Sequence, residues 1–160
     1  MSRLISVLLW VAAVGCGLAA GVYFAFSAFI MAALDRTGPV PGTIAMNSID
    51  VTILQSPFMP LFWGTTLASL ALAVIGLVQW RQAGGATLAA AGLIYVIGMF
   101  GVTAVCNVPL NDALAASDPH TAGGVAMWGR FMREWMLWNH VRTVTSLIAT
   151  VLFMVAMRAH

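Results

Sequence analysis

Polar side chains that could carry out chemistry gather at two points of an otherwise apolar chain. Asn107 and Asn111 are four residues apart around Pro109, and His140 and Arg142 open a later apolar run. Burial favours the neutral form of an imidazole, which can then accept a proton, so His140 is the candidate base. Fixed donors in a low dielectric stabilise developing negative charge, which suits Arg142 and both asparagines. These four polar residues at the ends of apolar runs mark either a functional site or a clamp between helices.

A second group of residues lies near the same points and could hold a flat ligand. Tyr23 and Ser27 are four residues apart, a spacing that places both side chains on one face of a helix. The aromatic members of the group could sandwich a ring system. The predicted substrate-binding residues are Tyr23, Phe26, Ser27, Phe58, Trp135, Trp138 and Asn139.

Each of these residues also has a purely structural interpretation. Asparagines in a membrane can tie helices together, an interaction that contributes about 0.6–2 kcal/mol. Tryptophans at the start of a membrane span commonly form the interfacial belt, and Arg142 could reach out to the interface. The residue types alone leave both interpretations open.

The elements that must position these residues are membrane helices. The chain is 61% hydrophobic and only 8% charged, whereas a soluble domain has about 25% charged residues. Crossing a hydrocarbon layer about 30 Å thick takes about 20 apolar residues. The runs long enough to do so are about 4–32, 60–80, 86–107 and 136–157. We therefore predict an all-α fold, with residues 1–160 forming one integral membrane domain built as a four-helix bundle.

The connections between these runs are unequal, which gives the bundle two different ends. The connection at 81–85 is short, whereas 35–59 and 111–135 are long and must lie on the same face of the membrane. Prolines and glycines in 35–59 favour an irregular or re-entrant segment. Residues 127–138 resemble an interfacial helix that leads into the fourth run. The polar residues singled out above lie at this long-loop end.

Arginines stand at both ends of the predicted bundle. Arg3, Arg81 and Arg158 are on the short-loop face, while the other four arginines are on the long-loop face, so counting positive charges does not decide the orientation. We expect a bacterial inner-membrane protein with both termini in the cytoplasm. Because no basic run forms a patch, we expect no nucleic-acid partner.

Several short motifs resemble those of a known family. The motifs, in chain order, are Gly21-Val22-Tyr23, Phe26-Ser27, Pro57-Phe58, Asn107-Val108-Pro109-Leu110-Asn111, Trp135, and Trp138-Asn139-His140-Val141-Arg142-Thr143. Together they resemble the anthrone oxygenase-like membrane family, much of which consists of uncharacterised bacterial proteins. The resemblance implies a four-helix membrane protein. It also implies oxidation of anthrones to anthraquinones by molecular oxygen without a recognised cofactor, as in the characterised members.

This resemblance and the polar cluster together predict a membrane oxygenase for a hydrophobic aromatic, anthrone- or quinol-like substrate that enters from the lipid. O₂ is the co-substrate, His140 the base, and Arg142 with Asn107 and Asn111 the enolate clamp. No cofactor is expected. The alternative is a site for copper or another metal in which His140 joins Asp112, His120 or one of the nearby methionines Met127, Met132 and Met136.

Other roles compete with catalysis. The same pocket in a noncatalytic membrane protein could bind a lipid or quinone, or the chain could be an accessory subunit of a membrane complex. Gly17 and Gly21 form a small-residue motif for close helix packing, either inside the chain or between copies in a homo-oligomer.

Overall fold

The protein is all-helical over the residues that the computed structural model describes, 3–159, with no strand among them. The helices, with π-helical turns labelled η, are α1 (Arg3–Ala25), η1 (Phe26–Ile30), α2 (Met31–Arg36), α3 (Pro39–Leu54), α4 (Phe58–Val78), α5 (Gly85–Tyr95), η2 (Val96–Gly101), η3 (Thr103–Asn107), α6 (Val108–Ala115) and α7 (Ala122–Ala159). Several of these join end to end into longer rods. The predicted fold class is confirmed.

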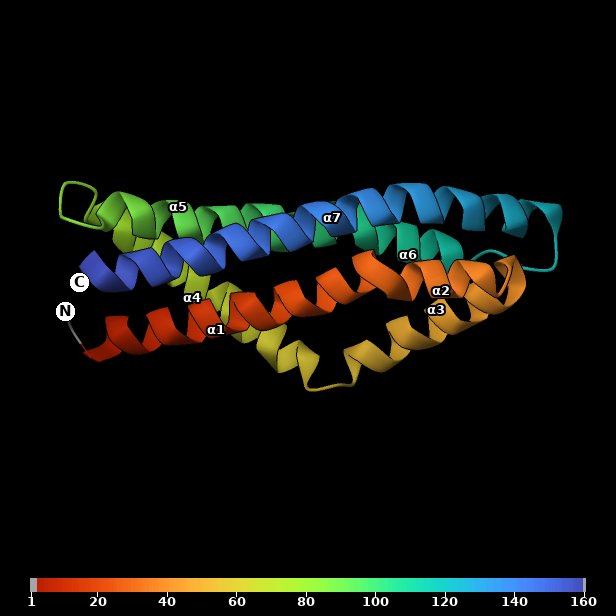
Figure 1. Ribbon diagram of the computed structural model, residues 1–160, viewed down its shortest axis with the longest axis horizontal. Helices are drawn as coiled ribbons and strands as arrows, with labels where there is room; N and C mark the ends of the chain where they lie inside the picture. Colours follow the sequence, from red (N-terminus) through yellow and green to blue (C-terminus); the bar gives the residue numbers. More distant parts are fainter. Residues whose placement is uncertain (1–2, 160) are drawn as a thin grey trace.

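Four helical rods are long and apolar enough to cross a membrane: Arg3–Arg36, Phe58–Val78, Gly85–Ala115 and Ala122–Arg158. At 1.5 Å per residue, the 21 residues of α4 extend about 32 Å, which matches the hydrocarbon layer. The 38 residues of α7 extend about 57 Å. The longer rods therefore continue beyond the layer, together with α3, at the end opposite the α4–α5 connection (Figure 1).

The connection at 35–59 differs from the prediction of an irregular or re-entrant segment, because most of it is the helix α3. Gly38 has a φ of 95°, which turns the chain sharply between α2 and α3. Pro39 and Pro41 then fall in the first turn of α3, where a missing N–H breaks no helical hydrogen bond. The prolines that indicated a loop are thus compatible with a helix start.

The predicted interfacial helix at 127–138 belongs to α7, which begins at Ala122 and continues unbroken into the fourth span. α1 begins and α7 ends at the same end of the bundle (Figure 1). The two long connections of the prediction, now largely helical, lie together at the other end.

Two hydrophobic cores stabilise the bundle. The first fills the space between α1, α4, α5 and α7, where small residues let the helices approach closely. A Cβ added at Gly76 of α4 would lie 2.4 Å from the backbone nitrogen of Ala89 in α5. The second core lies at the α3 end and contains Met31, Met46, Leu110, Leu114, Trp128, Phe131 and Trp135. The candidate site lies between the two cores.

Candidate functional site

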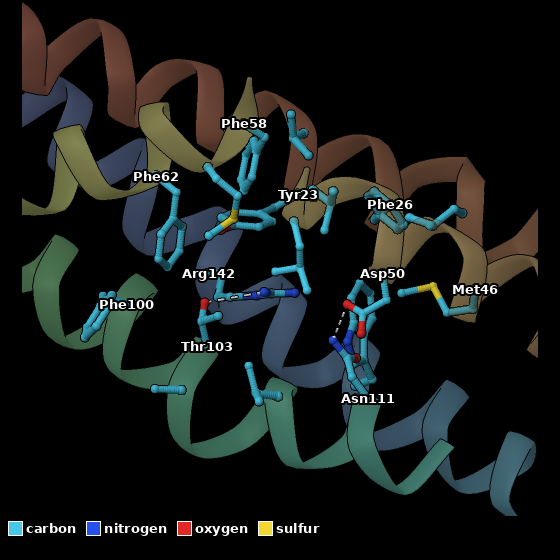
Figure 2. Close-up of a pocket in the computed structure, with 18 of the residues that line it drawn as sticks. Tyr23, Phe26, Met46, Asp50, Phe58, Phe62, Phe100, Thr103, Asn111 and Arg142 are labelled. Atoms are coloured by element: carbon cyan, nitrogen blue, oxygen red, sulfur yellow. Dashed lines mark hydrogen bonds between the residues drawn. The ribbon is translucent and has the colours of Figure 1, made fainter. Parts of the chain in front are cut away.

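A cavity of about 300 Å³ separates the two cores, at the lower end of the usual range for ligand sites. Its walls come from α1 and η1, α3, α4, the η2–η3–α6 rod, and α7 (Figure 2). Most of the lining is apolar and aromatic, including Phe26, Phe58, Phe62, Phe100 and Trp135. Rings on several sides shape the space for a flat, hydrophobic ligand.

Arg142 is the buried cation of this cavity, with only 5% of its surface exposed. Its guanidinium lies over the ring of Tyr23, 4.4 Å from the centroid, and 5.1 Å from that of Trp135. Nη2 donates to Asn139 Oδ1 at 2.8 Å and Nη1 donates to Thr103 Oγ1 at 3.4 Å. Arg142 thus has a fixed orientation, pointing into the cavity (Figure 2).

No carboxylate among residues 3–159 lies within 4.0 Å of Arg142. The Nε atom of Arg142 and the indole Nε1 of Trp135 are buried, and neither has a hydrogen-bond acceptor in the described part of the chain. Burying a cation without a partner anion is costly. The cavity therefore offers a preformed place for an oxygen that carries negative charge.

Asn139 holds Arg142 in place from behind the cavity wall. Its Nδ2 donates to the Tyr23 carbonyl and to Ser27 Oγ, each at 2.8 Å, so its Oδ1 is left to accept from Arg142. Asn107 likewise joins two helical elements, because its Nδ2, in η3, donates to the carbonyl of Trp135 in α7 at 3.3 Å. Both asparagines are buried and neither lines the cavity.

Asp50 lies on the α3 wall, beyond the tip of Arg142 (Figure 2). It accepts a hydrogen bond of 2.8 Å from Asn111 Nδ2. Burial, and secondarily the charge of Asp112, raise the pKa of the Asp50 carboxyl, while the Asn111 hydrogen bond and the Arg142 charge oppose the rise. A carboxylate with a raised pKa is a better proton acceptor than an ordinary aspartate.

The structure brings about half of the predicted site residues into the cavity. Those that line it are Tyr23, Phe26, Phe58, Asn111, Trp135 and Arg142. Those that do not are Ser27, Asn107, Trp138, Asn139 and His140. Trp138 instead lines a second pocket, between the η3–α6 rod and α7.

The placement of His140 corrects the expectation that it is the buried base. Its side chain is exposed, outside the cavity, and its Nδ1 lies 2.9 Å from Ser27 Oγ. Successive helical residues are rotated by about 100°, so residues two apart point to opposite sides. Because Arg142 faces the cavity, His140 two residues earlier cannot.

Sequence reasoning missed Asp50 and Thr103. Asp50 is the one acid within α3, Pro39–Leu54, and an isolated carboxylate in an apolar helix is a signal for function. The signal was hidden because that segment was interpreted as a loop. Thr103 starts the π turn η3, and its hydroxyl donates to the Met99 carbonyl at 2.7 Å.

The π-helical turns border the cavity. Phe26 belongs to η1, Phe100 to η2 and Thr103 to η3, and all three residues line the cavity. π turns are rare and are found often at functional sites. Among residues 3–159, no group of three or more His, Cys, Asp or Glu side chains is arranged to hold a metal ion.

The helices and the cavity define a four-span membrane protein with a buried, unpaired arginine facing a carboxylate in an aromatic pocket. The sequence model of the family described as anthrone oxygenase matches residues 52–152, well over half of the chain. The chain belongs to the anthrone oxygenase family, as the resemblance predicted. The match includes Asn111, Trp135 and Arg142 but begins just after Asp50. No curated protein and no solved structure is significantly similar to the chain.

Proposed function

We propose that this protein is a membrane oxygenase that oxidises a hydrophobic aromatic, anthrone- or quinol-like compound with O₂ and no cofactor; in an anthrone the oxidised position is the methylene carbon. The observation that carries the proposal is the buried Arg142, unpaired and aimed into an aromatic cavity whose other wall holds Asp50. The family description supports the reaction type. We place the protein in a bacterial inner membrane with both termini in the cytoplasm.

The first step is removal of a proton from the methylene carbon. Asp50 accepts this proton, aided by its raised pKa. The electron pair moves through the ring system to the ketone oxygen, which becomes an enolate oxygen. The Arg142 guanidinium, which points into the cavity, stabilises this oxygen.

The second step is attack of O₂ on the electron-rich carbon, which forms a C–O bond and a peroxide anion. The peroxide takes the proton back from Asp50. Asp50 then removes the second proton of the same carbon and the O–O bond breaks. The departing hydroxide takes that proton from Asp50 and leaves as water, which restores the Asp50 carboxylate. One O₂ is thus consumed for each carbonyl and each water formed. The apolar lining of the cavity keeps bulk water away from the carbanion.

A noncatalytic protein that binds a lipid or quinone is the competing role. Such a protein would use the same aromatic walls. It would gain nothing from a carboxylate with a raised pKa opposite an unpaired arginine. That pair therefore favours the enzyme.

Oxygen uptake by the purified protein in nanodiscs, with anthrone as substrate, tests the proposal. We expect uptake above the background of empty nanodiscs, and we expect Asp50→Asn to abolish it. Asp118→Asn, at an exposed acid between α6 and α7, is the matched control and should behave as the unmodified protein. Uptake equal to background, or full activity of Asp50→Asn, would contradict the proposal.

A further inference from the structure

The wall of the cavity is open on one side. Leu54, Trp63 and Val108 all line the cavity, yet 63%, 49% and 42% of their respective surfaces are exposed. Ala104 also lines it and is exposed. These four residues, which we call the mouth, come from the end of α3, from α4, from η3 and from α6. The opening therefore lies between the α3–α4 corner and the η3–α6 rod.

The depth of the mouth follows from α4, whose length matches the hydrocarbon layer. Phe58, at the start of α4, then marks one edge of the layer. Trp63 lies five residues further, about 8 Å inside that edge. A half-exposed tryptophan at this level is typical of the membrane interface. The mouth thus lies at the edge of the hydrocarbon layer: Trp63 meets the acyl chains, whereas Leu54, at the end of α3, lies at the level of the lipid headgroups.

The chemistry of the mouth agrees with this depth, because all four of its residues are apolar. If the opening faced water, these exposed side chains would form an unfavourable apolar rim. If the opening faces lipid, exposure of these apolar side chains carries no free-energy penalty. The polar lining residues Asp50, Asn111 and Arg142 lie deeper in the cavity and are less exposed.

One edge of the mouth is built from three aromatic rings. Trp63 and Phe62 of α4 have ring centroids 5.5 Å apart, and Phe100 of η2 lies 5.4 Å from Trp63 and 5.7 Å from Phe62. This cluster joins α4 to η2. Leu54 lies on the other side of the opening, where α3 ends and residues 55–57 lead to α4. A flat apolar ligand that enters through the mouth would contact these aromatic rings.

We infer that this mouth is a lateral entrance, through which the cavity exchanges a flat hydrophobic aromatic ligand directly with the hydrocarbon layer. The aromatic class of the ligand rests on the proposed function. The route rests on the position and the apolar character of the mouth. A substrate of this kind concentrates in the bilayer, so a lateral route spares it a passage through water.

Anthraquinone linked to the acyl chain of a phosphatidylcholine is the probe that tests the route, because it cannot leave the bilayer. It has no methylene group to oxidise, so binding is measured without turnover. In nanodiscs made with this lipid, we expect saturable quenching of the protein's tryptophan fluorescence. Absence of saturable quenching would overturn the lateral entrance. Because this readout needs no catalysis, it is distinct from failure of oxygen uptake.

Ala104→Phe narrows the mouth and leaves Asp50 and Arg142 untouched. We expect it to slow both association and dissociation of the tethered probe roughly tenfold, the effect of a barrier raised by about 1.4 kcal/mol. The matched control is Val105→Phe at the next residue, 74% exposed and outside the cavity lining, which should leave both rates unchanged. Equal rates in the two variants would overturn the proposal.

Discussion

Replacing Arg142 with methionine separates a catalytic role from a structural one, because the two roles predict opposite outcomes for stability. Methionine keeps an unbranched side chain in the same space but removes the cation. If Arg142 holds the enolate, Arg142→Met should nearly abolish turnover. Because no carboxylate lies within 4.0 Å of Arg142, its removal breaks no ion pair, and the fold should be retained.

The contacts of Arg142 give the size of the two effects. The substitution loses a charged hydrogen bond to Asn139, about 1.5–3 kcal/mol, and two cation–π contacts, with Tyr23 and Trp135, of about 0.5–2 kcal/mol each. It also removes the penalty of several kcal/mol for burying an unpaired cation. These terms nearly cancel, so the free energy of unfolding should change by about 2 kcal/mol or less. Loss of an oxyanion donor lowers kcat by about 10²–10³-fold.

The assay is oxygen uptake with anthrone in nanodiscs, combined with thermal unfolding of the same preparation followed by tryptophan fluorescence. Arg133→Met, at an exposed position of the same helix, is the control and should be unaffected in both measurements. Normal turnover by the Arg142→Met variant would refute a catalytic role for Arg142. A variant that loses activity only in proportion to a large loss of folded protein also refutes it.

Three further predictions concern the base, the histidine and the helix packing. Activity requires the deprotonated Asp50, so kcat/KM should fall as the pH drops through a pKa above the ordinary aspartate value of about 3.9. Asn111→Leu removes a hydrogen bond that lowers this pKa, so the fall should move to higher pH; an unchanged profile argues against Asp50 as the base. His140→Ala should retain kcat within about twofold in the oxygen-uptake assay, because the side chain lies outside the cavity; loss of turnover would restore the histidine as a catalytic candidate. Gly76→Ala should destabilise the fold by about 1–3 kcal/mol in thermal unfolding, because its Cβ would meet the α5 backbone. Gly64→Ala has open space at the added Cβ and is the control; equal unfolding temperatures would contradict the packing described for α4 and α5.

The membrane fold was predictable from the sequence because hydropathy is summed over runs of about 20 residues, so that no single residue decides the prediction. Each of the four rods contains an apolar run long enough to span the bilayer, and no local feature competes with that reading. α3 was harder, since Pro39 and Pro41 are equally compatible with a loop and with the first turn of a helix. Only its packing against α2, α6 and α7 decides between them.

The candidate site was predictable in part. Arg142 and Asn111 could be singled out because polar groups at membrane depth are costly. His140 was assigned from its residue type and its place beside Arg142 at the start of a span, although its spacing from Arg142 already places the two on opposite faces of one helix. Asp50 could not be identified as a site residue, because its position at the cavity depends on the helix α3, and that segment was predicted to be irregular. The π turns, which set the direction of Phe26 and Thr103, have no sequence signature as clear as hydropathy.

The division of the asparagines also depends on tertiary structure. Asn107 and Asn139 bond to neighbouring helices, whereas Asn111 reaches the cavity and Asp50. Nothing in the residue type distinguishes the three. Their difference lies in the rotation of each helix about its own axis, which the π turns alter by adding a residue to a turn.

The central claim is that Asp50 and Arg142 together form and stabilise the enolate that O₂ attacks. The most direct test supplies ¹⁸O₂ to the purified protein with anthrone and measures by mass spectrometry both the rate and the label of the anthraquinone formed. The account predicts fast formation of anthraquinone carrying one ¹⁸O atom, reduced to the background rate in both Asp50→Asn and Arg142→Met. Product without ¹⁸O, or labelled product formed equally fast by these variants, would contradict it.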